Sequence, residues 1–122
     1  MSGSITTTAA GYFSAMREGF NRVDLAKIEA YSDLIFKAWQ EDRRVYLFGN
    51  GGSAYTASHH CTDYVKTAMV EGQKRLQAYS LADNTGLITA LGNDISYDDV
   101  FRTLYLTHGQ ITANLGKPDA GR

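Results

Sequence analysis

The sequence has one cysteine, almost no net charge and no long apolar run, and each shortage excludes a class of protein. With Cys61 alone, the 122-residue chain cannot form an internal disulfide framework. Twelve basic against 13 acidic residues leave no basic excess for binding nucleic acid or an anionic membrane surface. No apolar stretch is long enough to span a bilayer, and residues 1–10 lack the pattern of a signal peptide. We therefore expect a cytoplasmic protein with no nucleic-acid or membrane partner.

The N-terminal third predicts two amphipathic helices. Apolar residues recur at helical spacing over residues 9–21 and again over residues 24–40, where Asp24 is a plausible N-cap. We expect residues 1–8 to be disordered and residues 9–42 to form a helical hairpin. Its apolar stripe is typical of a core or a subunit interface, so the hairpin favours oligomerisation.

The rest of the chain predicts an α/β fold within a single domain, residues 1–122. The pattern predicts strands at 43–50 and 76–81, helices at 53–70, 84–91 and 97–106, and a polar turn at 92–94. Strand, helix and strand in this order form a βαβ unit with parallel strands. Residues 108–122 show no clear period, apart from a possible short strand at 111–115.

Two strands make an incomplete sheet. A two-stranded parallel sheet cannot cover both of its faces or protect its edges. Either another chain completes the sheet, or the sequence is the front part of a larger fold.

The main candidate site is the segment Gly49-Asn50-Gly51-Gly52-Ser53, which lies between the first strand and the next helix. Glycines allow close approach of a ligand, and unpaired N–H groups at a helix start favour an anion, usually a phosphate. The Ser53 hydroxyl adds a donor. With Ala54, the segment also satisfies the dinucleotide pattern G-x-G-x-x-G/A, although Asp83 comes late for the acidic residue that this pattern requires. A tight turn without a ligand is the third interpretation.

A second candidate is the pair His59 and Asp63, which lie four residues apart and so share one helix face. Such a pair can bind one zinc ion, act in proton transfer, or simply form a solvated face. A metal needs a further ligand, and beyond the neighbouring His60 the only other histidine is His108. Cys61 is better explained as a small buried residue than as a ligand.

The third candidate is Asp94, in the segment Ala90-Leu-Gly-Asn-Asp94. This segment follows the second strand, on the side where open α/β sheets bind ligands. Asp94 could accept hydrogen bonds from sugar hydroxyls, or could simply belong to a helix-ending turn.

Taken together, these motifs resemble the sugar isomerase (SIS) domain family, and within it the sedoheptulose 7-phosphate (phosphoheptose) isomerases. The resemblance rests on four segments in the same order and spacing: Leu47–Ser53, Ala57–His59 with Asp63, Ala90–Asp94, and Tyr97–Phe101. It implies a homotetramer whose subunits fold as an α/β sandwich around a parallel sheet. It also implies ketose–aldose isomerisation of a seven-carbon sugar phosphate.

The resemblance also implies roles for individual residues. The substrate-binding residues would be Asn50, Gly51, Gly52, Ser53 and Asp94. His59 and Asp63 would be zinc ligands, and both would be catalytic, with Asp63 as the base at a position where the family carries a glutamate.

Two departures from the family pattern affect the expected activity. The side chain of Asp63 is one methylene shorter than glutamate, and a positioning error of roughly 1 Å can cost about a hundredfold in rate. After Phe101 the family continues into a strand and a Ser/Thr-rich phosphate loop, which residues 102–122 do not match. We therefore expect a truncated or frame-shifted product, or a naturally short SIS domain, with a divergent tail at residues 102–122. A non-catalytic SIS module that binds a phosphosugar or a protein partner is the alternative function.

Overall fold

The computed structural model describes the backbone of residues 5–115 and the side chains of residues 6–108. The chain divides into two compact units, where the sequence led us to expect one domain. The boundary falls between Phe36 and Lys37, near the end of the second helix. Each unit is described by itself below.

The first unit consists of helix α1 (Ile5–Asn21) and most of helix α2 (Leu25–Gln40). The predicted cap of α2 is confirmed, because the backbone amide of Ala26 donates a hydrogen bond of 3.1 Å to Oδ1 of Asp24. Since α1 begins at Ile5, the prediction of disorder through residue 8 was wrong for residues 5–8. Residues 1–4 lie outside the described part of the chain.

The predicted hairpin is not formed, because α1 and α2 do not pack along one another. Their large apolar side chains are exposed instead: Tyr12, Phe13, Met16, Phe20, Leu25, Ile28, Tyr31 and Leu34. Apolar periodicity indicates that a helix face is suited to burial, but it does not identify what covers that face. The apolar stripe was predicted correctly, and its burial in a subunit interface stays a prediction.

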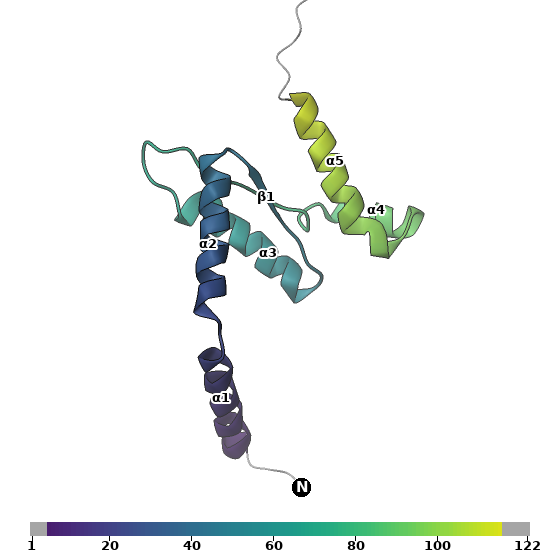
Figure 1. Ribbon diagram of the computed structural model, residues 1–122. Coiled ribbons are helices and arrows are strands. Elements are labelled where there is room, and N and C mark those ends of the chain that lie inside the picture. The colour runs from purple at the N-terminus through teal and green to yellow at the C-terminus, as the bar shows by residue number, and fades with distance from the viewer. Residues whose placement is uncertain (1–4, 116–122) are drawn as a thin grey trace, which may run out of the picture. The chain divides into compact units, whose positions relative to one another are not determined.

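The second unit contains the predicted βαβ arrangement. Strands β1 (Arg44–Leu47) and β2 (Gln77–Ser80) are parallel, and Val45 pairs with Ala78. Both strands are shorter than predicted, and they form a two-stranded sheet among the described residues. Helix α3 (Gly52–Thr62) follows β1 through a tight turn and continues into a π-helical segment, η1 (Asp63–Thr67) (Figure 1). The α/β class and the incomplete sheet are thus confirmed.

The two faces of this sheet contact different helices, as alternating side chains require. On one face Ser80 lies against Ser58 of α3, with their hydroxyl oxygens 3.2 Å apart. On the other face the ring of Tyr46 stacks on that of Tyr79, with the ring centres 5.7 Å apart. The ring of Tyr46 also meets that of Tyr105 edge-on, with the ring centres 5.4 Å apart.

Two further helices follow β2. They are α4 (Thr85–Asp94) and α5 (Val100–Leu115), with a 3₁₀ turn, η2 (Tyr97–Asp99), between them. Leu81 joins Val100 and Leu104 in a fully buried cluster, which positions this helix pair on the sheet. No described helix has the length and apolar character that crossing a membrane requires.

Two sequence predictions about this region were wrong. Residues 92–94 do not form a turn, because α4 continues and the amide of Ile95 still bonds to the carbonyl of Leu91 at 3.0 Å. Residues 111–115 are helical and do not form a strand. Helix α5 extends past the predicted end at residue 106 as far as Leu115, and residues 116–122 lie outside the described part.

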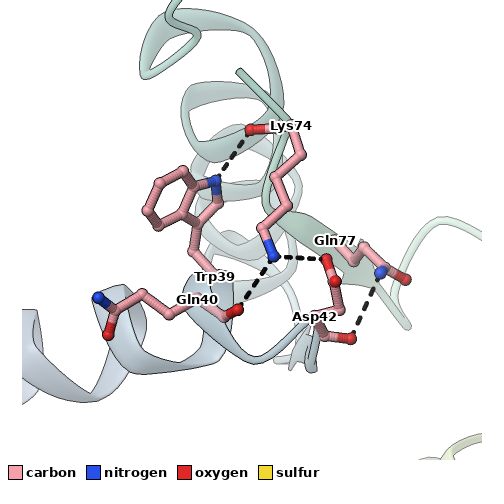
Figure 2. A network of polar contacts seen from close by, with 5 residues as sticks. All are labelled: Trp39, Gln40, Asp42, Lys74 and Gln77. Carbon is pink, nitrogen blue, oxygen red and sulfur yellow. Dashed lines mark hydrogen bonds and ion pairs between the residues drawn. The ribbon is translucent and has the colours of Figure 1, made fainter.

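A polar network, which we call the Lys74 network, ties the end of α2 to the start of β2 (Figure 2). The indole N–H of Trp39 donates to the carbonyl of Lys74 at 2.8 Å. In return, Lys74 Nζ donates to the carbonyl of Gln40 at 3.0 Å and lies 2.9 Å from Oδ1 of Asp42. Asp42 has a positive φ of 54°, which reverses the chain toward β1. The network therefore positions both strands at their N-terminal ends.

Candidate functional site

The glycine turn at the end of β1 has a geometry that glycine alone permits. A Cβ on Gly49 would lie 2.6 Å from Cβ of Ser53 and 2.8 Å from its carbonyl carbon, so a side chain there would collide with the start of α3. Gly51, the N-cap of α3, has a φ of 55°, a left-handed conformation that other residues adopt at a cost. The turn thus delivers the chain directly from the strand to the helix N-terminus.

The backbone amides at the start of α3 and at its N-cap differ in whether they have a backbone hydrogen-bond acceptor. The amide of Ser53 bonds to the carbonyl of Asn50 at 3.0 Å, and that of Ala54 bonds to the carbonyl of Gly51 at 3.1 Å. Among the described residues, no backbone acceptor bonds the amides of Gly51 and Gly52. These two amides, together with the positive end of the helix dipole, form a local environment that favours an anion.

Asn50 is held by a residue to which the sequence analysis assigned no role. The hydroxyl of Tyr97 donates a hydrogen bond of 2.9 Å to Oδ1 of Asn50, across 47 residues of sequence. The ring of Tyr97 packs close to Gly92, where an added Cβ would lie 3.3 Å from a ring carbon. The motif Tyr97–Phe101 was part of the family resemblance, and this was the only signal available for Tyr97.

His59 and Asp63 meet as predicted. Nε2 of His59 lies 3.6 Å from Oδ2 of Asp63, and the hydroxyl of Thr67 donates to Oδ1 of Asp63 at 3.1 Å. The His59 side chain is 77% exposed and that of Asp63 is 41% exposed. The other carboxylate oxygen is held by Thr67 because η1 continues the helical path beyond Thr62.

This pair would supply at most two ligands to a zinc ion, whereas a catalytic zinc site has three from the protein and one open position. Within the described part of the chain, no group of three or more His, Cys, Asp or Glu side chains is placed to hold a metal. Proton transfer, zinc binding and a solvated helix face therefore all stay predictions for this pair. His108 lies instead beside Tyr46, with the two ring centres 6.1 Å apart.

Asp94 is the last residue of α4. It is exposed, and its Oδ1 accepts a hydrogen bond of 2.8 Å from the side-chain amide of the adjacent Asn93. No hydrogen bond or ion pair given for the described residues joins Asp94 to the glycine turn. The residue near the end of α4 that contacts Asn50 is Tyr97, in η2.

An open cleft of about 540 Å³ begins at the glycine turn, and we call it the Asp83 cleft. It is lined by Gly51, Ala54, Tyr55, Ser58, Ala82, Asp83 and Thr85. The hydroxyl of Ser58 donates to Oδ1 of Asp83 and also lies 3.2 Å from the hydroxyl oxygen of Ser80. The sequence analysis considered Asp83 only as a ribose ligand and passed over Ser58, because a helix residue facing a loop gives no periodic signal.

Ser53 and Cys61 do not line this cleft. Ser53 lines a different hollow of about 390 Å³ between α3 and β1, together with Thr56 and His60. Cys61 is buried, as expected, and burial raises the pKa of its thiol, with a smaller contribution from the negative charge of Asp83.

Comparison with known proteins finds relatives of similar sequence. A probable phosphoheptose isomerase from Thermoplasma acidophilum is 40% identical over 79 residues, which are 65% of this chain and 43% of that protein. A phosphoheptose isomerase from Syntrophotalea carbinolica is 30% identical over 100 residues, 80% of this chain and 50% of that protein. The lincomycin biosynthesis protein LmbN from Streptomyces lincolnensis is 38% identical over 73 residues, 60% of this chain and 26% of LmbN.

The structure of phosphoheptose isomerase GmhA from Neisseria gonorrhoeae matches with a TM-score of 0.66 and 26% identity. The match covers 93% of this chain and 56% of that one, so the fold described here is part of a larger one in the relative. Against the curated relatives named above, the chain spans between 26% and 50% of their length. The model of the SIS domain matches residues 11–114, most of the sequence. This chain therefore belongs to the SIS domain family.

Proposed function

We propose that the chain forms part of a sugar-phosphate isomerase site, which converts sedoheptulose 7-phosphate to an aldose heptose 7-phosphate. The glycine turn carries this proposal, since it combines the amides of Gly51 and Gly52 with a fixed Asn50 side chain at one helix N-terminus. That combination suits a phosphate group. The similarity to proteins named phosphoheptose isomerase supports the choice of substrate.

In this proposal Asp63 is the catalytic base. Ketose–aldose isomerisation removes a proton from the carbon next to the carbonyl, forms an enediol, and returns a proton to the former carbonyl carbon. His59 and Thr67 each contact one carboxylate oxygen of Asp63, which orients it for this transfer. Asp94 and Ser53 would contact the substrate, as the family resemblance implies.

Zinc, a homotetramer and a cytoplasmic location also remain proposals. His59 and Asp63 would hold zinc only with a third ligand from outside the described residues or from another subunit. When bound, zinc would polarise the substrate carbonyl. The exposed apolar side chains of α1 and α2 support association with further subunits.

Hydrogen exchange tests the proposed reaction directly. The chain is incubated with sedoheptulose 7-phosphate in D2O, and NMR follows deuterium entering the carbon next to the carbonyl. We expect exchange with the unaltered chain and a loss of about a hundredfold or more in Asp63→Asn, because general-base catalysis contributes about that much. Asp33→Asn makes the same change on the exposed face of α2 and should exchange at the unaltered rate. Equal exchange by the chain and Asp63→Asn would refute the role of Asp63.

The alternative is a non-catalytic SIS module that binds a phosphosugar or a protein partner. The exposure of the His59–Asp63 pair favours it, since proton transfer from carbon is usually carried out where water is excluded. Calorimetric binding of sedoheptulose 7-phosphate without any exchange would support this module, and exchange would exclude it.

A further inference from the structure

The Asp83 cleft has a chemical character different from that of the glycine turn at its end. Asp83 is the only charged residue that lines it, and the other polar side chains are the hydroxyls of Ser58, Thr85 and Tyr55. Ala54 and Ala82 have small side chains, which leaves the cleft open. Its volume of about 540 Å³ is in the range of small-molecule sites.

The negative charge of Asp83 determines which part of a ligand can lie there. A phosphate beside a carboxylate would be repelled, and no lysine or arginine lines the cleft to offset this. A neutral group that donates hydrogen bonds is favoured instead, because bonds to a charged acceptor are among the stronger ones. The cleft therefore suits a hydroxylated carbon chain whose anionic end lies at Gly51.

Ser58 holds Asp83 in a defined position. Its hydroxyl donates to Oδ1, and the carbonyl of Ala54 lies 3.1 Å away as a second acceptor for the same proton. The Ser58 oxygen is also 3.2 Å from that of Ser80, which in turn accepts from the amide of Ala82 at 3.2 Å. Within the described residues, no protein donor bonds Oδ2 of Asp83. This oxygen is available to a ligand, and a carboxylate oxygen can accept from two neighbouring hydroxyls.

We propose that the Asp83 cleft binds the hydroxyl-bearing carbon chain of the ketose phosphate, with Asp83 as a specificity-determining residue and Ser58 as its positioning residue. This inference rests on the proposed function, which places the phosphate at Gly51 and Gly52. It predicts that Asp83 discriminates between sugar phosphates by the number of hydroxyl groups they carry. A site built to bond a substrate hydroxyl rejects analogues that lack it, because its own polar group is then left unpaired.

Calorimetric titration of the full chain tests this with two probes, sedoheptulose 7-phosphate and inorganic phosphate. Asp83→Asn should raise the Kd of the sugar phosphate by about tenfold or more, the effect of losing a hydrogen bond to a charged group. The Kd of inorganic phosphate should stay unchanged or fall. Asp33→Asn, the same change on α2, should alter neither.

Ser58 is tested with the same two probes. Ser58→Ala should weaken binding of the sugar phosphate and not that of inorganic phosphate, and Ser58→Thr, which keeps the hydroxyl, should restore it. A general loss of structure would weaken both probes together, and that result would overturn the positioning role.

These measurements distinguish a failure of the cleft proposal from a failure of the proposed function. If the unaltered chain binds sedoheptulose 7-phosphate and Asp83→Asn binds it equally well, the cleft proposal is wrong and the proposed function stands. If Asp83→Asn weakens both probes equally, the discrimination by hydroxyl groups is wrong. If the unaltered chain binds neither probe, the proposed function and this inference both fail.

Discussion

The Tyr97 hydroxyl donates a 2.9 Å hydrogen bond to Oδ1 of Asn50, linking the turn between α4 and α5 to the glycine turn after β1. Loss of this bond in Tyr97→Phe should lower the free energy of unfolding by about 1 kcal/mol, the net value of a typical hydrogen bond. The variant should also bind inorganic phosphate more weakly, because Asn50 is no longer held. Urea unfolding and calorimetry measure the two effects. Tyr12→Phe on α1 is the control, and equal stability of the two variants would contradict this role.

Substituting alanine for Gly49 and for Gly86 should have opposite effects on stability. Gly49→Ala should destabilise the second unit by about 2–3 kcal/mol, as overpacking does, because the new Cβ would lie 2.8 Å from backbone of α3 that cannot move aside. Gly86→Ala in α4 meets nothing closer than 3.8 Å and should stabilise the helix by up to about 1 kcal/mol. Thermal unfolding by circular dichroism compares them. A Tm of Gly49→Ala equal to that of the unaltered chain would show that the turn is not close-packed.

The Lys74 network should contribute to stability mainly through charge. Lys74→Met keeps the apolar stem and removes the contacts to Gln40 and Asp42, and it should cost about 1 kcal/mol. The loss should shrink in high salt, since both charged side chains are partly exposed. Fluorescence of Trp39, the only tryptophan, reports unfolding in urea. Lys66→Met in η1 is the control, and a loss independent of salt would argue for packing instead.

Asp83 should influence the thiol of Cys61. Burial, and to a smaller degree the charge of Asp83, raises the pKa of Cys61 above its usual value. Asp83→Asn should therefore move the midpoint of iodoacetamide alkylation to lower pH, but only part of the way, because burial remains. Asp98→Asn in η2 should leave the midpoint in place. An unchanged midpoint in Asp83→Asn would show that burial alone sets this pKa.

The same pKa shift has a consequence for stability. Because the folded state holds the thiol proton more tightly than the unfolded state, the unfolded chain releases it first as the pH rises. The contribution of Cys61 to stability is thus full below the usual thiol pKa and declines above it. Urea unfolding between neutral pH and pH 10 should show a steeper decline for the unaltered chain than for Cys61→Ser.

Lengthening the proposed base tests the position of Asp63. If the family's glutamate is better placed, Asp63→Glu should raise the rate of hydrogen exchange into sedoheptulose 7-phosphate, by up to about a hundredfold for a shift of roughly 1 Å. Asp63→Asn should lower the rate by about a hundredfold or more. A slower rate in Asp63→Glu would indicate a site adapted to the shorter side chain.

The sequence alone was sufficient for the parts of this protein that local rules govern. The cap at Asp24, the parallel β1–α3–β2 order and the glycine turn at Gly51 all follow from residue type and short-range spacing. His59 and Asp63 meet because they are one helical turn apart, which periodicity predicts without knowledge of the fold. These features could be stated before the structure was known.

Only the tertiary structure decided which distant side chains meet. Tyr97 reaches Asn50 across 47 residues, and Ser58 reaches Asp83 across 25, contacts that no local pattern encodes. The helix over residues 111–115 and the exposed stripes of α1 and α2 were likewise beyond local reasoning. Propensity is a weak guide where burial against other elements determines the conformation of a segment.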